Sequence, residues 1–214
     1  MDVLSIVNAG LSELTSSSSA AFALAAIGLG IHFGYSGLLN FGQAGFMAIG
    51  AYGFAMWTSL VDPTELWGWP PLLSFVSAVL VAVLASVIFA LILGIPTLRL
   101  RGDYLAIVTI AAAEIIRFTV RTGDLSEVTG GSQGMNQQEF NGDFVEIRAF
   151  DEGRIGFGPF EAGANEASVR VLGWSLVVIA LLVTYLLMRS PWGRVLKGIR
   201  EDEDAVRSLG KNVY

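Results

Sequence analysis

The stretch Val171-Leu-Gly-Trp-Ser-Leu-Val-Val-Ile-Ala-Leu-Leu-Val-Thr-Tyr-Leu-Leu-Met188 decides the fold, because it is almost entirely apolar and carries no charge. As a helix rising about 1.5 Å per residue, it is long enough to cross most of a hydrocarbon core about 30 Å thick. The residues that follow it, Ser190–Tyr214, change abruptly to a charged pattern. The sequence therefore predicts a membrane-spanning helix that delivers a charged segment to the membrane surface.

Four further apolar blocks precede this one. They cover 20–39, 41–61, 69–95 and 104–120, and the Ser-rich residues 15–19 predict a polar N-cap for the first. Apolar residues make up 53% of the chain and charged residues only 15%, which is too apolar for an ordinary soluble domain. The prediction is an all-α, polytopic membrane protein of about five transmembrane helices, with helices 1–4 within 20–120 and helix 5 within 169–189.

Basic residues predict the orientation of these helices, because Lys and Arg are enriched in cytoplasmic segments. Arg99 and Arg101 follow the third block, and further basic residues lie between Arg189 and Lys211. The loop 121–168 is acidic, and the tail 1–19 has no Lys or Arg, so it also lacks the basic region of a cleavable signal peptide. We therefore expect the tail and the loop to be extracytoplasmic and 190–214 to be cytoplasmic.

Catalytic and metal-binding patterns are missing from the sequence. Cysteine is absent, which excludes disulfides and thiolate metal sites, and no ligand spacing joins the single His32 to carboxylates. His32 is better explained as a neutral packing residue than as a proton relay. The loop Thr129-Gly-Gly-Ser-Gln-Gly134 lacks the Lys of a phosphate-binding loop. No enzymatic activity, cofactor, metal or nucleic-acid partner is therefore expected.

The segment Gly34-Tyr-Ser-Gly-Leu-Leu-Asn-Phe-Gly-Gln43 is polar, uncharged and interrupted by Gly, as expected of a discontinuous helix that lines a pathway. The block after it is rich in small residues, and close helix packing is the simplest account of them. Polar groups in or beside such spans are costly unless water or substrate meets them. The predicted path residues are Asn40, Gln43, Thr109 and Glu114, with an ion pair to Arg117 as the alternative for Glu114.

The charged tail predicts a short docking helix. Four acids, 201–204, cluster where a helix would begin, at the positive end of its dipole, and Gly210 stands where it would stop. Ala205, Val206 and Leu209 form an apolar edge at helical spacing. We predict about two to three turns over 201–210. The residues assigned to docking are Arg200, Glu201, Glu203, Ala205, Val206, Leu209 and Gly210.

Four blocks resemble motifs of the permease subunits of branched-chain amino acid ABC importers. Residues 34–52 are similar to the family's GYxGxxxxGxxxFxxIGAY stretch, and 98–109 with 114–117 to its LRLRGxYxAIxT…EIIR block. Residues 129–134 resemble its TGGxxG loop, and 190–205 its SxxGRAxxAIREDExAA coupling segment. The blocks occur in matching order, and the resemblance is closest to the second permease type, which has a long outer loop.

The resemblance implies a multi-pass subunit in the cell membrane of a prokaryote, forming part of a translocation path. It implies a second permease subunit, cytoplasmic ATPase subunits that hydrolyse ATP and an extracytoplasmic substrate-binding protein as partners. It also assigns the docking helix to the ATPase, although Val195, Gly198 and Val206 stand where the family has Ala. Family members continue for several spans beyond this segment, so we expect the chain ending at Tyr214 to be part of a longer protein.

Branched-chain amino acids are the expected substrates. Permeases for urea, short amides or simple sugars share parts of the same blocks and remain the nearest alternatives. A channel or secondary carrier driven by a gradient, acting through Glu114 or His32, is the alternative from another class. Such a carrier needs no docking helix, whereas an ATP-driven permease must transmit the closure of its ATPase through one.

Overall fold

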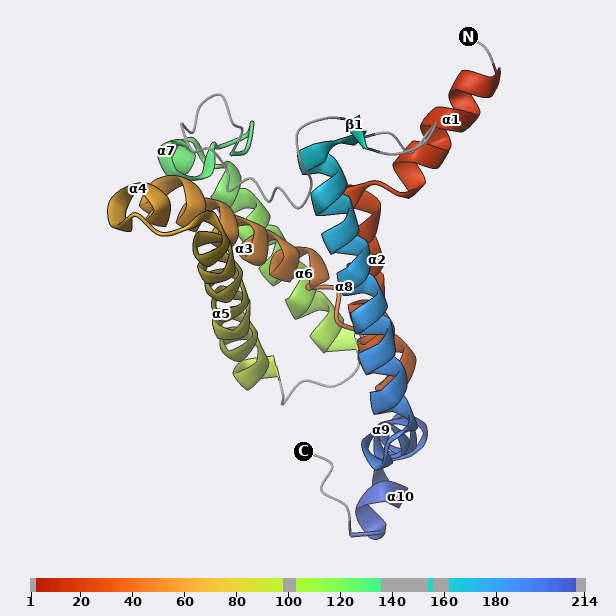
Figure 1. Ribbon diagram of the computed structural model, residues 1–214. Coiled ribbons are helices and arrows are strands. Elements are labelled where there is room, and N and C mark those ends of the chain that lie inside the picture. Colours follow the sequence, from red (N-terminus) through yellow and green to blue (C-terminus); the bar gives the residue numbers. More distant parts are fainter. Residues whose placement is uncertain (1–2, 98–102, 136–153, 156–161, 211–214) are drawn as a thin grey trace. The chain divides into compact units, whose positions relative to one another are not determined.

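The computed structural model describes residues 3–97, 103–135, 154–155 and 162–210 (Figure 1). The basic pair Arg99 and Arg101 lies outside these residues. The chain divides into two compact units, one made of Met1–Leu38 with Arg148–Tyr214 and the other of Leu39–Ile147. Among the described residues, both units consist mainly of helices, as the sequence predicts, and a two-residue ladder pairs β1 (Arg154–Ile155) antiparallel with β2 (Ala162–Gly163).

The first unit begins with a helix where the sequence predicted only a tail. Its helices are α1 (Val3–Leu14), α2 (Ser17–Leu29), the π-helical turn η1 (Gly30–Tyr35), α8 (Ala164–Arg189), α9 (Pro191–Glu201) and α10 (Glu203–Ser208). Ser16 caps α2, its side chain accepting a hydrogen bond from the Ser19 N–H at 3.2 Å, which confirms the predicted polar entry. The first span ends at Tyr35 and not at Leu39, because Gly37 adopts a φ of 71° that leaves the helix.

Helices α2 and α8 lie side by side and run in the same direction (Figure 1). Just before the start of α2, the Thr15 carbonyl accepts a hydrogen bond at 3.0 Å from the indole N–H of Trp174, which lies in the first half of α8. A Cβ on Gly173 would lie 3.0 Å from the Ala20 Cβ, so the two backbones approach closely there. At their ends, α9 follows α8 and contacts η1, which follows α2. The two helices are therefore parallel along their lengths.

The second unit is built around a helix of small residues. It comprises α3 (Gln43–Met56), η2 (Trp57–Val61), α4 (Pro63–Trp67), α5 (Pro71–Thr97), α6 (Asp103–Arg121), η3 (Gly123–Leu125) and α7 (Ser126–Thr129). A Cβ on Gly45 would lie 3.1 Å from the Ala113 Cα on α6, and one on Gly53 would lie 3.4 Å from the Ala82 Cα on α5. The small residues of α3 thus allow close packing on two neighbours, as predicted, while Met47 stays 37% exposed.

Aromatic contacts fix the direction of α5 against α3. The rings of Phe46 and Phe89 lie 4.9 Å apart, and those of Phe54 and Phe75 lie 5.7 Å apart. Residue numbers in these contacts increase along α3 while they decrease along α5, so the two helices are antiparallel. Along α6, Thr109 contacts Phe41 and Ala113 contacts Gly45, so α6 runs parallel to α3.

Four helical stretches of the described residues are long and apolar enough to cross a membrane: Ser17–Tyr35, Gln43–Val61, Pro71–Thr97 and Glu166–Arg189. Helix α6 is 19 residues long but carries Glu114, Arg117 and Arg121. If these four stretches cross a bilayer, the chain passes through it in the same direction in α2 and in α8. The chain must then cross an odd number of times between the end of α2 and the start of α8. Helices α3 and α5 supply two, and the acidic segment before α8 has no apolar block to supply another. If α6, which is parallel to α3, also crosses the bilayer, the five spans predicted from the sequence meet this requirement.

Candidate functional site

The helix broken between Ser36 and Gly42 is the most unusual feature of the spanning region. The Ser36 N–H still donates to the Ile31 carbonyl at 3.2 Å, and the Leu38 N–H to the His32 carbonyl at 3.0 Å. At Gly37 the positive φ, which side chains with a Cβ rarely adopt, turns the chain out of the helix. Regular helix resumes only at Gln43. This segment has the discontinuous form that the sequence predicted.

Thr109 and Asn40 hold the far end of the break. The buried Thr109 hydroxyl accepts a hydrogen bond from the Phe41 N–H at 3.1 Å and donates to the Leu105 carbonyl at 2.9 Å. The Asn40 side-chain oxygen accepts one from the Gly42 N–H at 2.9 Å. Both side chains therefore satisfy backbone groups that the break would leave without partners. Asn40 and Thr109 lie together as predicted, but their hydrogen bonds go to the backbone.

Gln43 differs from the other predicted path residues in its surroundings. It begins α3 directly after the break and is half-buried. Unlike Asn40 and Thr109, its side-chain amide makes no hydrogen bond to another of the described residues. This amide is not fully buried, so it is open to water or to a solute.

Glu114 lies on another side of α6. It is five residues beyond Thr109, which at about 100° per residue places it roughly 140° around the helix. Its carboxylate is paired with Arg117, whose Nε donates to Oε2 at 2.8 Å and whose Nη2 contacts Oε1. Both side chains are nearly half exposed. The ion pair offered as the alternative for Glu114 is therefore present, and Glu114 does not join the other three path residues.

The predicted docking helix is divided in two at Asp202. This residue has an extended backbone, and its carboxylate accepts hydrogen bonds from the Asp204 and Ala205 N–H groups, both at 3.0 Å. Asp202 is thus the N-cap of α10, which begins at Glu203, whereas Glu201 ends α9. The prediction of one helix over 201–210 was wrong in its start and its length, although the acidic first turn and the positive φ of Gly210 agree with it.

The apolar edge of α10 is also divided. Val206 is half-buried against α9, where a Cβ on Gly198 would lie only 2.9 Å from the Val206 Cγ2. Leu209 points elsewhere and is 80% exposed. The charged side is held within α10, because Arg207 pairs with Glu203 at 2.8 Å. Leu209, which follows α10 directly, is therefore an exposed apolar side chain, while Val206 joins α10 to α9.

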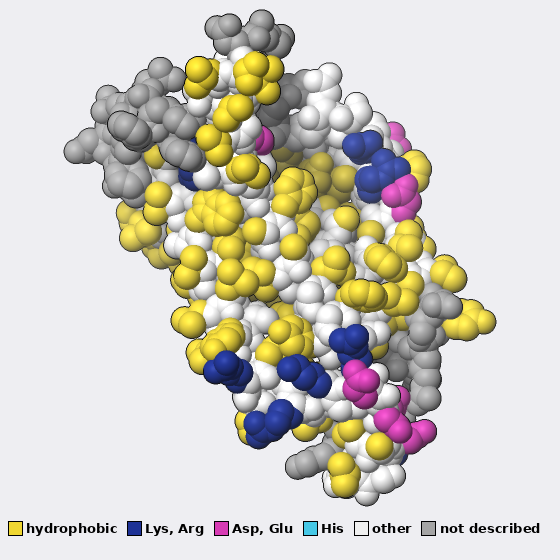
Figure 2. Space-filling model, turned by 90° about the vertical axis from the view of Figure 1, so that its right-hand side faces the viewer, with side chains coloured by type: hydrophobic (Ala, Val, Ile, Leu, Met, Phe, Trp, Pro, Cys, Tyr) yellow, Lys and Arg dark blue, Asp and Glu magenta, His cyan; other side chains and the backbone are white. Residues whose placement is uncertain are grey.

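Helix α9 is attached to the end of η1. The Arg200 guanidinium donates a hydrogen bond to the Gly34 carbonyl at 2.5 Å. The Cγ of the same side chain would lie 3.0 Å from a Cβ built on Gly37. One turn earlier, the Lys197 ammonium stands 5.5 Å from the Tyr35 ring centroid. The sequence assigned Arg200 to a partner protein, so this contact was missed. The basic residues of α8 and α9 gather at the lower end of the view in Figure 2, below an apolar surface.

A polar hollow lies at the end of α3 and α6 that is away from Asn40 and Thr109. It has a volume of about 860 Å³ and is lined by Arg121, Glu127 and residues of η2 and of the 129–134 loop. The Thr129 hydroxyl donates to the Val120 carbonyl at 2.8 Å and accepts from the Gly131 N–H at 3.2 Å. Gly130 has a φ of 72°, and a Cβ there would lie 2.1 Å from the Gly134 oxygen. Gly130 is thus required by the fold of this loop.

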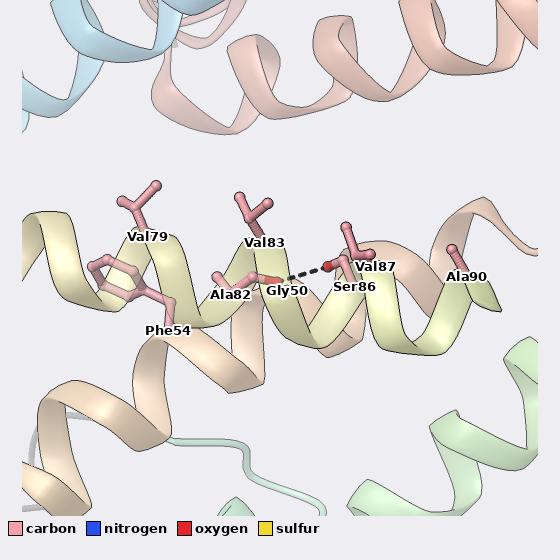
Figure 3. A pocket seen from close by; sticks show the side chains of 8 residues that line it. All are labelled: Gly50, Phe54, Val79, Ala82, Val83, Ser86, Val87 and Ala90. Atoms are coloured by element: carbon pink, nitrogen blue, oxygen red, sulfur yellow. Dashed lines mark hydrogen bonds between the residues drawn. The ribbon is translucent and has the colours of Figure 1, made fainter. Parts of the chain in front are cut away.

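An open apolar groove of about 400 Å³ runs along α3 and α5 (Figure 3). Valines of α5 and Phe54 of α3 line it, and the Ser86 hydroxyl on its floor donates to the Ala82 carbonyl at 2.9 Å. The only hydroxyl in its lining is therefore already satisfied. Such a surface suits lipid chains or a neighbouring apolar helix and offers no polar group to a water-soluble substrate.

Four helices long and apolar enough to span a membrane, a discontinuous helix and the charged pair of helices after α8 are together typical of a multi-pass membrane protein. The chain belongs to the family described as branched-chain amino acid transport system / permease component, whose profile matches residues 13–214. This is the family indicated by the sequence motifs.

Three curated relatives support this membership. The chain is 38% identical over 193 residues to the high-affinity branched-chain amino acid transport system permease protein LivM of Escherichia coli, covering 86% of this chain and 42% of that protein. The Salmonella typhimurium protein of the same description is 39% identical, with the same coverage. A probable branched-chain amino acid transport permease protein LivM of Methanocaldococcus jannaschii is 27% identical, over 89% of this chain and 56% of that protein. The chain thus spans about half the length of these relatives, and no solved structure matches it.

Proposed function

We propose that the protein containing this chain is a membrane-spanning subunit of an ABC importer and forms part of the translocation path for branched-chain amino acids. The observation that carries the proposal is the charged α9–α10 pair at the end of α8, with Leu209 exposed and Arg200 bonded to the broken helix. A gradient-driven carrier has no use for such a pair. The descriptions of the relatives favour branched-chain amino acids over urea, short amides or sugars.

The partners in this proposal are a second permease subunit, cytoplasmic ATPase subunits and an extracytoplasmic binding protein. ATP would be hydrolysed on the ATPase subunits. The test is affinity purification of the full-length protein from its native membrane, followed by identification of the proteins that co-purify. An ATPase, a partner permease and an amino-acid-binding protein are expected, and purification of the permease alone as an active transporter would contradict the proposal.

The proposed orientation places the N-terminus outside the cell and α9 and α10 in the cytoplasm. It is supported by the basic residues of 189–200 and by the acidic composition of the loop before α8. Because the chain has no Cys, single cysteines at Ser132 and Ser208 can report their own exposure. A membrane-impermeant maleimide added to intact cells should label the first and not the second. Labelling of both from outside would exclude this orientation.

The proposed path passes Gln43. A change to Leu removes the amide while keeping a side chain of similar size, so transport should fall while ATPase binding persists. Asn40 and Thr109 would shape the path by holding the backbone beside it. Unchanged uptake in the Gln43→Leu variant would make this amide a helix-packing residue and remove it from the path.

A further inference from the structure

We propose that Arg200 is a positioning residue that transmits movement of the α9–α10 pair to the broken helix between Ser36 and Gly42. This inference rests on the proposed function and adds to it the mechanical link between the docking helix and the path. It gives Arg200 an intramolecular partner in place of one on the ATPase.

The first step is the chemistry of the Arg200 contact. Carbonyls in the last turn of a helix lack intrahelical partners and carry the negative end of its dipole. Gly34 lies at the end of η1, and the Arg200 guanidinium donates to its carbonyl at 2.5 Å. A permanently charged donor at this position is a charge-assisted cap supplied by a segment 166 residues away in the sequence.

The second step is that α9 holds the same turn at two points. Lys197 and Arg200 are three residues apart and so lie on one face of α9. Lys197 stands over the Tyr35 ring at 5.5 Å, within the range of a cation–π interaction. The Arg200 side chain also covers Gly37, at which the chain turns out of the helix. A displacement of α9 therefore acts directly on the start of the break.

The third step connects α10 to this contact. Val206 packs against Gly198, which lies between Lys197 and Arg200 on α9. A force on the exposed Leu209 is thus carried through α10 and α9 to Arg200, a path of packed side chains and one hydrogen bond. At the other end of the break, the Thr109 hydroxyl fixes the Phe41 N–H to α6.

The test uses the full-length permease, made free of other cysteines, in the assembled transporter. A cysteine at Ser36, a conservative change of a half-buried hydroxyl, reports the accessibility of the break to a small maleimide. With Arg200 present, the labelling rate should differ about fivefold or more between the nucleotide-free and the vanadate-trapped states, the lower end of typical coupling between sites. In Arg200→Gln this difference should disappear, and in Lys197→Gln it should be reduced.

The matched control is Arg194→Gln, the same substitution at an exposed position of α9, which should keep the nucleotide response. The amount of ATPase that co-purifies should be unchanged in all three variants. A full nucleotide response in Arg200→Gln would overturn the proposal. Loss of ATPase binding in that variant, with binding intact in Lys197→Gln, would assign Arg200 to the ATPase and would also overturn it. Because labelling needs no substrate, leucine uptake by the same transporters tests the proposed function separately.

Discussion

Truncation of Leu209 to Ala should weaken binding of the ATPase without changing the fold in the membrane. Leu209 is 80% exposed, so almost all of its side chain remains to be buried by a partner. Leu→Ala removes three carbons, each contributing about 0.8 kcal/mol when buried, and incomplete burial lowers the sum to about 1.5–2.5 kcal/mol. The dissociation constant for the ATPase should therefore rise roughly 10- to 70-fold.

The assay is binding of the purified ATPase to the permease in lipid nanodiscs, measured at a series of ATPase concentrations. The matched control is Leu182→Ala, the same substitution at a residue of α8 that is 57% exposed on a spanning helix and is expected to face lipid. It should leave the dissociation constant unchanged. Equal affinity for the wild type and Leu209→Ala would show that α10 is not seated in the ATPase, and would refute the role given to its exposed edge.

Three further predictions concern the contacts that hold the candidate site. Gly198→Ala should displace α10, because the new Cβ would lie 2.9 Å from the Val206 Cγ2. Adding Val206→Ala should restore the position of α10. A double-mutant cycle of ATPase binding should give a coupling energy of about 0.5–3 kcal/mol between the two positions. Thr109→Val should lower the free energy of unfolding by about 1–3 kcal/mol, because it leaves the Phe41 N–H without an acceptor. The change should appear as a lower melting temperature of the purified protein. Gly130→Ala should also lower the melting temperature, because the new Cβ would overlap the Gly134 oxygen. An unchanged melting temperature in either variant would contradict the prediction for that variant.

Much of the fold could be predicted because membrane insertion leaves a strong local signal. Long apolar runs can be satisfied only as helices in lipid, so the spans were found to within a few residues. The Ser16 cap and the break at Gly37 were likewise local, since hydroxyl side chains cap helices and glycine adopts a positive φ. The start of α10 was missed because Asp202 and Asp204, within the same acidic run, can each serve as an N-cap, and only the backbone geometry selects Asp202.

The candidate site was predicted less completely, because its contacts join residues far apart in the sequence. Thr109 was selected as a polar residue among apolar ones, but its partner, the Phe41 N–H, is 68 positions away. Arg200 was assigned to a partner protein because a charge pattern does not reveal which carbonyl it will meet. Gly198 and Val206 were noted separately as departures from the family pattern, and their packing explains both: the small residue accommodates the large one.

The most direct test of the central claim is the energy source for accumulation of a branched-chain amino acid. The full-length permease should be reconstituted with its partner permease, ATPase and binding protein in liposomes whose ion gradients are collapsed by ionophores. Radiolabelled leucine should accumulate inside only when ATP is supplied on the ATPase side and the binding protein on the other. Accumulation that follows an imposed ion gradient and ignores ATP would contradict the account.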